Sequence, residues 1–248
     1  MTNSLNVKAH KKRMSSGNGR AVDEIANRPA QVPCNSPINE VRGWDNLKVS
    51  KYYARGSVLF TEGQQPRGVY VLREGRAKVS VASAEGKTFV LRIAEVGDLL
   101  GVHSILMGRP SGATVETIER CRIDFVSRDD FVKLLNRDQH AYLGVAQALS
   151  NKLNGVMEHA RLLLLSESAT EKLARLLVRW CDEHGTSTPQ GIRINSGLTH
   201  EDMAQMICAS RETVTRVLGE LRRRRIVRVV DNTLFVRNLE GLASLARC

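Results

Sequence analysis

Three charged side chains between Ser210 and Arg225 have the types and spacing to read DNA: Arg211, Glu212 and Arg216. An arginine carries a planar fork that pairs with O6 and N7 of guanine, and a glutamate can accept a hydrogen bond from the amino group of cytosine. On a helix all three would lie on the wet side, where they could address different base pairs. If they met base edges, each good pair would give about 1–3 kcal/mol of discrimination.

Hydroxyl and basic groups around these three residues suit phosphates, which orient a protein on a duplex without reading its sequence. The predicted phosphate contacts are Thr199, Ser210, Thr213 and Arg222. Arg222 opens a run of four arginines that ends at Arg225. This run either approaches phosphates or is simply solvated, and both interpretations stay open.

Two helices are predicted to position these groups. From Arg211 to Arg223 apolar residues recur at i, i+3, i+4 and i+7, which is the spacing of one helix face, and Ser210 is a suitable N-cap. That face consists of Val214, Val217, Leu218 and Leu221. A shorter helix is predicted from Thr199 to Ile207, where Thr199 and Asp202 resemble a capping box.

Only Cys208, Ala209 and Ser210 separate the two predicted helices, and this is the turn length of a helix-turn-helix motif. The second helix of such a motif can enter the major groove with its N-terminal side chains at the base edges. The alternative is an amphipathic hairpin on a globular surface, in which the charged side is only solvated.

The run Ser210-Arg211-Glu212-Thr213-Val214-x-Arg216 resembles the recognition helix of the CRP/FNR family of bacterial regulators, and the resemblance extends from Trp44 to Val236. In that family the positions matching Arg211, Glu212 and Arg216 read bases. The resemblance implies an α+β fold with an N-terminal cyclic-nucleotide-binding-type antiparallel β-roll, a long dimerisation helix and a C-terminal winged helix-turn-helix. It also implies a homodimer on a near-palindromic operator with a TGTGA-like half-site.

The chain divides into four predicted segments. Residues 1–43 form a basic, largely disordered tail, because they are polar and lack apolar periodicity. Residues 44–140 form the β-roll, since apolar residues there alternate with polar ones, as in Val69 and Val71 or Phe89, Leu91 and Ile93, between regularly spaced glycines. Residues 141–165 form the dimerisation helix. Residues 166–248 form the winged helix-turn-helix, with Asp231-Asn232 as its hairpin turn.

The segment before residue 165 carries an apolar ladder at intervals of three and four. Its members are Ala146, Leu149, Leu153, Val156, Ala160 and Leu163. Two such helices could bury the ladder against each other as a coiled coil, and paired readers on a near-palindromic site need a two-fold protein. The alternative is that the helix packs only on its own β-domain.

The basic composition is compatible with nucleic acid, an anionic membrane surface or no specific partner, and only the arrangement on one helix favours the first. The chain has 37 Lys and Arg against 26 Asp and Glu, a formal charge of +11, and no apolar run long enough to span a membrane. Five scattered cysteines indicate no disulfide framework, so a reducing cytoplasm is expected. The six histidines lack metal-site spacing and no Gly-x-Ser-x-Gly elbow occurs, so we expect no enzyme and no metal.

The resemblance places an effector pocket between the β-roll and the dimerisation helix. Its expected residues are Leu100, Gly101, Val102, His103, Ser104, Arg109, Ser111, Gly112, Ala113, Val156 and Met157. Val102 stands where cyclic-AMP-binding members have a glutamate, and Ser111-Gly112 where they have an Arg-Ser pair, which disfavours cyclic AMP. Arg109 alone keeps that ligand open.

Two cofactors of the family are also disfavoured. An iron–sulfur cluster needs several thiolates, and Cys34 and Cys121 cannot supply them. A haem ligand could be His103, expected in a short loop, but Gly101 replaces the neighbouring cysteine of the haem-binding branch. The cofactor is thus left unknown.

The sequence predicts a sequence-specific, DNA-binding transcription regulator, gated by an unidentified effector or by none. The alternatives are an effector-binding module whose C-terminal domain docks a protein partner, and a haem-based gas sensor. The resemblance implies RNA polymerase as a further partner, contacted through the loop at residues 186–190. The position of the operator on its promoter would decide between activation and repression.

Overall fold

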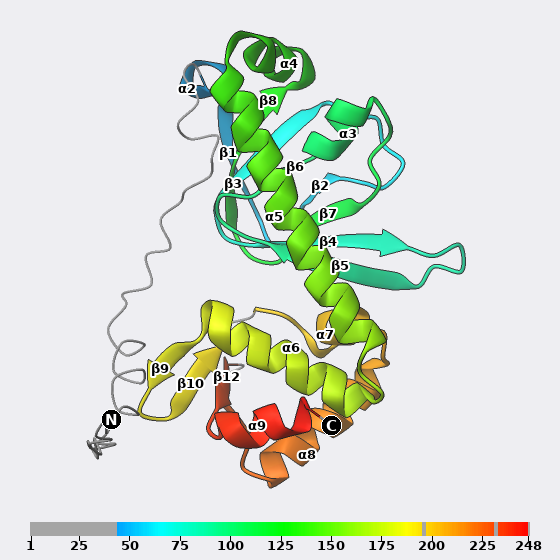
Figure 1. The fold of residues 1–248 in the computed structure, drawn as a ribbon, viewed down its shortest axis with the longest axis vertical. Helices are drawn as coiled ribbons and strands as arrows, with labels where there is room; N and C mark the ends of the chain where they lie inside the picture. Colours follow the sequence, from blue (N-terminus) through cyan, green and yellow to red (C-terminus); the bar gives the residue numbers. More distant parts are fainter. Residues whose placement is uncertain (1–43, 195–196, 231–232, 248) are drawn as a thin grey trace, which may run out of the picture. The chain divides into compact units, whose positions relative to one another are not determined.

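The computed structural model describes residues 44–194, 197–230 and 233–247 (Figure 1). Two four-stranded antiparallel sheets form the N-terminal part, and a third antiparallel sheet belongs to the C-terminal part. This is the predicted α+β arrangement. The tail at 1–43, with Cys34, and the Asp231-Asn232 turn lie outside the described residues.

The N-terminal β-domain, residues 49–127, pairs its strands as two sheets, in the orders β1-β8-β3-β6 and β2-β7-β4-β5. Its strands are β1 (Val49–Tyr53), β2 (Val58–Phe60), β3 (Gly68–Glu74), β4 (Ala77–Ala82), β5 (Thr88–Ala94), β6 (Leu99–Leu100), β7 (Thr114–Thr117) and β8 (Cys121–Ser127). The sheets enclose a core that includes Leu72, Val115 and Ile123. Cys121 is fully buried in that core.

Four helices accompany this domain in the described chain up to residue 164. They are α2 (Trp44–Leu47), α3 (Val102–Met107), α4 (Arg128–Arg137) and α5 (Gln139–Leu164). Ala141 and Val145 of α5 pack into a core with Phe131 of α4 and Val69 of β3. At its other end Leu162 enters the core of the C-terminal domain. One continuous helix therefore takes part in two cores (Figure 1).

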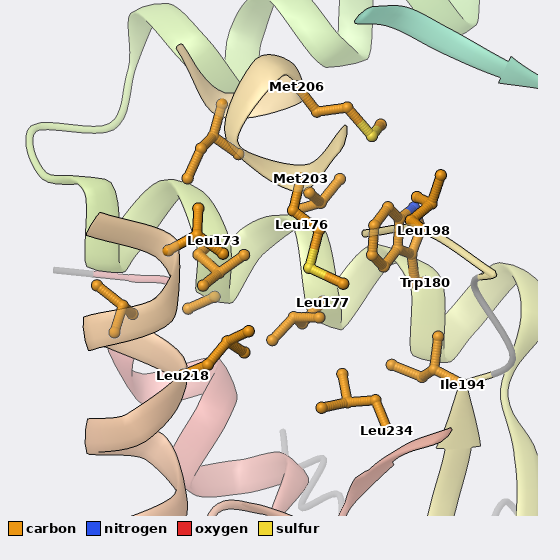
Figure 2. Packing of buried hydrophobic residues seen from close by; sticks show 14 of the residues in the cluster. Leu173, Leu176, Leu177, Trp180, Ile194, Leu198, Met203, Met206, Leu218 and Leu234 are labelled. Carbon is orange, nitrogen blue, oxygen red and sulfur yellow. The ribbon is translucent and has the colours of Figure 1, made fainter. Parts of the chain in front are cut away.

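The C-terminal domain, residues 169–247, is a winged helix-turn-helix, as predicted. Its elements are α6 (Ala169–His184), β9 (Thr186–Thr188), β10 (Gly191–Ile194), α7 (His200–Ile207), α8 (Arg211–Arg223), β11 (Val227–Val230), β12 (Thr233–Val236) and α9 (Leu239–Leu245). The sheet order is β11-β12-β10-β9. Figure 2 shows its core, in which Leu173, Leu176 and Leu177 of α6 lie near Met203 and Leu218.

Two local predictions differ from the structure. The fully buried residues of β5 are Val90 and Ala94, whereas Phe89, Leu91 and Ile93 are half-buried. Both faces of this strand are covered, since Phe89 contacts the ring of His159 of α5 and Val90 belongs to the C-terminal core. Alternation cannot identify the inner face of such a strand. His103 lies on helix α3, not in a loop.

No helix of the described chain combines the length and the hydropathy that crossing a membrane requires.

Candidate nucleic-acid interface

The two helices of the helix-turn-helix begin at well-formed caps. Thr199 Oγ1 accepts from the Asp202 amide at 3.1 Å, while Asp202 Oδ2 accepts from the Thr199 amide at 2.9 Å, which completes the predicted capping box. Ser210 Oγ accepts from the Thr213 amide at 3.2 Å and caps α8. These bonds satisfy amides that would otherwise lack partners in the first turns, so both helix starts are fixed.

The apolar face of α8 is buried as predicted. Val214, Val217, Leu218 and Leu221 are each at most 3% exposed. They pack in one cluster with Leu173 and Leu176 of α6 and with Met203 of α7 (Figure 2). Because this face is held on one side, the rotation of α8 about its axis is set and the opposite side faces solvent.

That opposite side carries the three predicted base readers. Arg211, Glu212 and Arg216 are exposed. Within the described chain no ion pair engages Arg211 or Arg216, whereas Arg224 is paired with Glu220 at 2.5 Å. The two guanidinium groups near the start of α8 are therefore free to pair with an outside ligand, and their planar forks match guanine or phosphate.

Glu212 is an ionised acceptor. Its pKa lies below the usual value because its own backbone amide and the Ser210 hydroxyl hydrogen-bond to the carboxylate, and Arg211 adds a favourable charge. A carboxylate at the N-terminus of a helix is also favoured by the helix dipole. Glu212 can accept a hydrogen bond from a base amino group without first losing a proton.

The predicted phosphate contacts surround these readers, but three of their hydroxyls are already used. Thr199 and Ser210 act as caps, and Thr213 Oγ1 lies 3.1 Å from Ser210 Oγ. Thr199 gives its single proton to Asp202 Oδ2 at 2.7 Å, and Ser210 and Thr213 share a hydroxyl–hydroxyl bond, so donating to a phosphate would require these hydroxyls to exchange partners. Arg222 is exposed in the last turn of α8.

One polar contact on this side was not predicted. His200 Nδ1, in the first residue of α7, lies 2.9 Å from Thr215 Oγ1 of α8. Thr215 is exposed and sits between Arg211 and Arg216 in the helix. Sequence periodicity could have placed Thr215 on the outer side of α8. The contact itself could not be predicted, because it joins two helices and no sequence spacing fixes how they meet.

Helix α5 exposes an apolar stripe over most of its length. Leu153 is 60% and Leu164 82% exposed, and Tyr142 and Met157 are about half exposed. Of the predicted dimer ladder, Ala146, Leu153 and Val156 are exposed, whereas Leu149, Ala160 and Leu163 are half-buried. Leu149 and Leu163 contact the cores of their own chain. The ladder thus lies partly along the edge of the stripe.

The predicted effector residues from 100 to 113 lie on β6, at the start of and on α3, and between α3 and β7. Leu100, Val102, Ser104 and Ser111 are buried, Gly101 and Ala113 are half-buried, and His103, Arg109 and Gly112 are exposed. Gly101 has a φ of 80°, and a Cβ there would lie 3.1 Å from the Gly68 carbonyl oxygen. Val156 and Met157 are exposed on α5, and Met157 shares the apolar stripe with Leu153 and Leu164.

A charged group not foreseen from the sequence lies between α5 and the β-domain. Arg92 of β5 forms an ion pair with Asp98. Burial and, to a smaller extent, the charge of Arg92 lower the pKa of Lys152 of α5 to about 8, although the charge of Asp98 opposes them. Two cations thus face one carboxylate where the resemblance expected the effector.

The described cysteines and histidines form no metal site. Across residues 44–194, 197–230 and 233–247 no three His, Cys, Asp or Glu side chains are grouped to hold an ion. Cys121 and Cys181 are buried, and Cys208 is exposed. A cavity of about 20 Å³ lined by Trp180, His184 and Ile194 has room for roughly one water molecule. It is too small for an effector.

Two family models match the chain. A cyclic nucleotide-binding domain matches residues 50–138, and a Crp-like helix-turn-helix domain matches residues 171–245. The first covers the β-domain with α4, and the second covers α6 to α9. The class is therefore a transcription regulator with an N-terminal cyclic-nucleotide-binding-type domain and a C-terminal DNA-binding domain.

Relatives of the same class span most of the chain. The CRP-like cAMP-activated global transcriptional regulator of Mycobacterium tuberculosis is 25% identical over 195 residues, which is 79% of this chain and 87% of that protein. The fumarate and nitrate reduction regulatory protein of Salmonella typhi is 28% identical over 222 residues, 87% of this chain and 86% of that protein.

The fold is shared with a CooA mutant from Carboxydothermus hydrogenoformans, with a TM-score of 0.72, 24% identity and coverage of 88% of this chain and 98% of that one. The chain belongs to the CRP/FNR family of DNA-binding transcription regulators. Members of this family are regulators rather than enzymes.

Proposed function

We propose that this regulator binds a near-palindromic DNA operator as a homodimer, with Arg211, Glu212 and Arg216 reading base edges in each half-site. The observation that carries the proposal is the outer side of α8, where two guanidinium groups that form no ion pair with any described residue lie beside an ionised carboxylate. Buried Val214, Val217 and Leu218 fix the direction of this side. Thr199, Ser210, Thr213 and Arg222 would contact phosphates.

The dimer would form through the apolar stripe of α5. Exposed apolar side chains at residues 142, 146, 153, 157 and 164 follow the 3.6-residue period on one side of the helix. A stripe of this length usually marks a protein–protein contact. The working division is then a β-roll at 44–140, a dimerisation helix at 141–165 and a DNA-binding domain at 166–248.

An effector, if required, would act through the β-roll and α5. The sequence lacks the glutamate and the Arg-Ser pair of cyclic-AMP-binding members. Between the β-roll and α5 the structure has instead the charged group of Arg92, Asp98 and Lys152. The regulator would work in the cytoplasm and contact RNA polymerase through residues 186–190, which are strand β9 and the turn after it rather than the expected loop.

The proposal is tested by selecting binding sites from random duplexes with the purified protein, with and without cell metabolites. We expect an inverted repeat. Arg216→Ala should then lose about 5- to 150-fold on the selected site and little on random DNA, since a bidentate base contact gives about 1–3 kcal/mol. Arg222→Ala should weaken binding to selected and random DNA alike, and it should reduce the slope of log K against log salt concentration by about one.

Arg224→Ala is the matched control, because Arg224 is paired with Glu220 at the far end of α8. Arg224→Ala should change the affinity for the selected site and for random DNA only slightly. Equal losses of Arg216→Ala on selected and random DNA would contradict base reading. A protein that stays monomeric and prefers no inverted repeat under any condition tried would contradict the whole proposal, and capture of a protein partner instead would favour a docking module.

A further inference from the structure

A hydrogen-bonded pair spans the two helices of the helix-turn-helix on its exposed side. His200 of α7 and Thr215 of α8 meet at 2.9 Å between Nδ1 and Oγ1. Neither side chain belongs to the apolar face of its helix, and both residues are exposed. The pair therefore adds nothing to the core, while it restrains two side chains that face an outside ligand.

Counting protons shows how the pair is held. Thr215 Oγ1 donates to the Arg211 carbonyl oxygen at 2.9 Å, and a hydroxyl has only one proton to give. With this proton used, His200 Nδ1–H is the donor in the second bond. The hydroxyl is thus fixed on two sides, and so is the χ1 angle of Thr215. The methyl group and one lone pair of the hydroxyl are the parts of this side chain that remain free for a contact.

Thr215 lies at the centre of the outer side. It follows Arg211 by four residues and Glu212 by three, and these are the intervals that bring side chains together on a helix. Gly219, four residues further on, has no side chain, and a Cβ there would meet nothing within 4 Å. No protein group at position 219 therefore shields the methyl group of Thr215.

We propose that the methyl group of Thr215 reads the C5-methyl group of a thymine in each half-site, and that His200 is the positioning residue that holds it there. Thymine is the base that presents a methyl group in the major groove, and a threonine methyl is a suitable apolar partner. The proposal rests on the proposed DNA-reading function of α8. It adds an apolar reading contact to the polar ones of Arg211, Glu212 and Arg216.

The test removes single methyl groups from the DNA. In the duplex selected by the wild-type protein, each thymine is replaced in turn by uracil, which keeps every hydrogen-bonding group. At one position per half-site, wild-type affinity should fall roughly fourfold, the value expected for one buried methyl group. Thr215→Ser keeps the hydroxyl without the methyl group. This variant should therefore bind the duplexes with thymine and with uracil at that position equally well.

Two further variants separate the methyl from the hydroxyl. Thr215→Val keeps a methyl group but loses both hydrogen bonds of the hydroxyl, so it should keep a reduced difference between thymine and uracil. His200→Ala should reduce the difference at that position alone, and His140→Ala, an exposed histidine of α5, should not. Circular dichroism melting checks that each variant is folded.

The inference is overturned if no thymine position responds in the wild type, or if Thr215→Ser keeps the full difference. Either result can occur with a protein that still selects an inverted repeat, so the DNA-reading proposal would survive. If the wild type selects no site at all, both proposals fail together.

Discussion

At the scale of single residues, two non-glycine residues of the described chain hold a left-handed backbone. Cys208 has a φ of 54° and Arg225 a φ of 57°. Cys208 ends α7 and Arg225 follows the end of α8, where its amide donates to the Arg222 carbonyl oxygen at 3.0 Å. Helices commonly end this way, but with glycine, because a Cβ costs about 1–2 kcal/mol there.

Replacing Cys208 by glycine should stabilise the protein. Cys208→Gly removes the Cβ strain but gives the unfolded chain more freedom, so we expect a net rise of about 0.5–1 kcal/mol in the free energy of unfolding. Urea denaturation measures it. Cys208→Ala is the control, since alanine keeps the strain and loses only an exposed thiol. If alanine stabilises as much as glycine, the backbone explanation is wrong.

The outward placement of Arg211, Glu212 and Arg216 could be predicted because a single period decides which side of a helix is buried. The helical period could not predict the contact between His200 and Thr215. Their contact depends on the angle at which α7 and α8 meet, and that angle is set by packing around Met203, Leu218 and the helices beneath.

At the scale of elements, α5 has two differently used sides. Ala141, Val145 and His159 face the chain's own cores, and the side with Leu153 and Leu164 is exposed. Burial lowers the pKa of His159 to about 4, with a further contribution from Arg179, so this side carries a neutral imidazole at neutral pH. The centre of the exposed side is apolar and consists of Leu153 and Met157.

A charge on the exposed stripe should separate the dimer. We expect Leu153→Lys to sediment as a monomer and to lose at least tenfold in operator affinity, because two facing lysines would be desolvated without a partner. Asn151→Lys adds the same charge to an exposed position on another side of α5 and should remain dimeric. Analytical ultracentrifugation distinguishes the two, and a dimeric Leu153→Lys protein would exclude this interface.

Long elements were predictable, whereas several short ones were not. The ladder of α5 and the stripe of α8 each extend over several turns, so tertiary contacts hardly change their period. Helix α3, strand β9 and helix α9 are three to seven residues long. In such segments one turn or one paired strand decides the conformation, and the neighbours that stabilise it are distant in sequence.

At the scale of the whole described chain, polar links join the β-domain to the DNA-binding domain. Lys78 Nζ of β4 lies 3.4 Å from Asp202 of α7, and His184 Nε2 at the end of α6 lies 3.0 Å from Glu95. Hydrogen bonds with Glu183 and then with Glu95 raise the pKa of His184 to about 9, although burial opposes the shift. The imidazolium is therefore charged at neutral pH.

This link should weaken in alkali. A raised folded-state pKa means that the contribution of His184 is fully present below its unfolded value near 6.5 and is lost as pH rises through about 9. Between pH 7 and 9.5 the free energy of unfolding should fall more steeply for the wild type than for His184→Gln. Denaturant titrations at several pH values measure the difference.

Lys152 titrates in the same range with the opposite sign, because burial lowers its pKa to about 8, so stability should rise above that pH. The titration of Lys152 contributes equally to the wild type and to His184→Gln, so it cancels when their slopes are compared. Glu95→Gln should show an intermediate slope, since Glu183 still faces His184. Identical slopes for wild type and His184→Gln would show that this ion pair does not stabilise the fold.

The continuity of α5 limits how the gene can change. The helix has 26 residues, with Ala141 anchored in one core and Leu162 in the other. Each inserted residue between these anchors would turn one core against the other by about 100° and separate them by about 1.5 Å. An insertion of seven residues nearly restores the phase. Natural length variation in this segment should therefore come in pairs of turns.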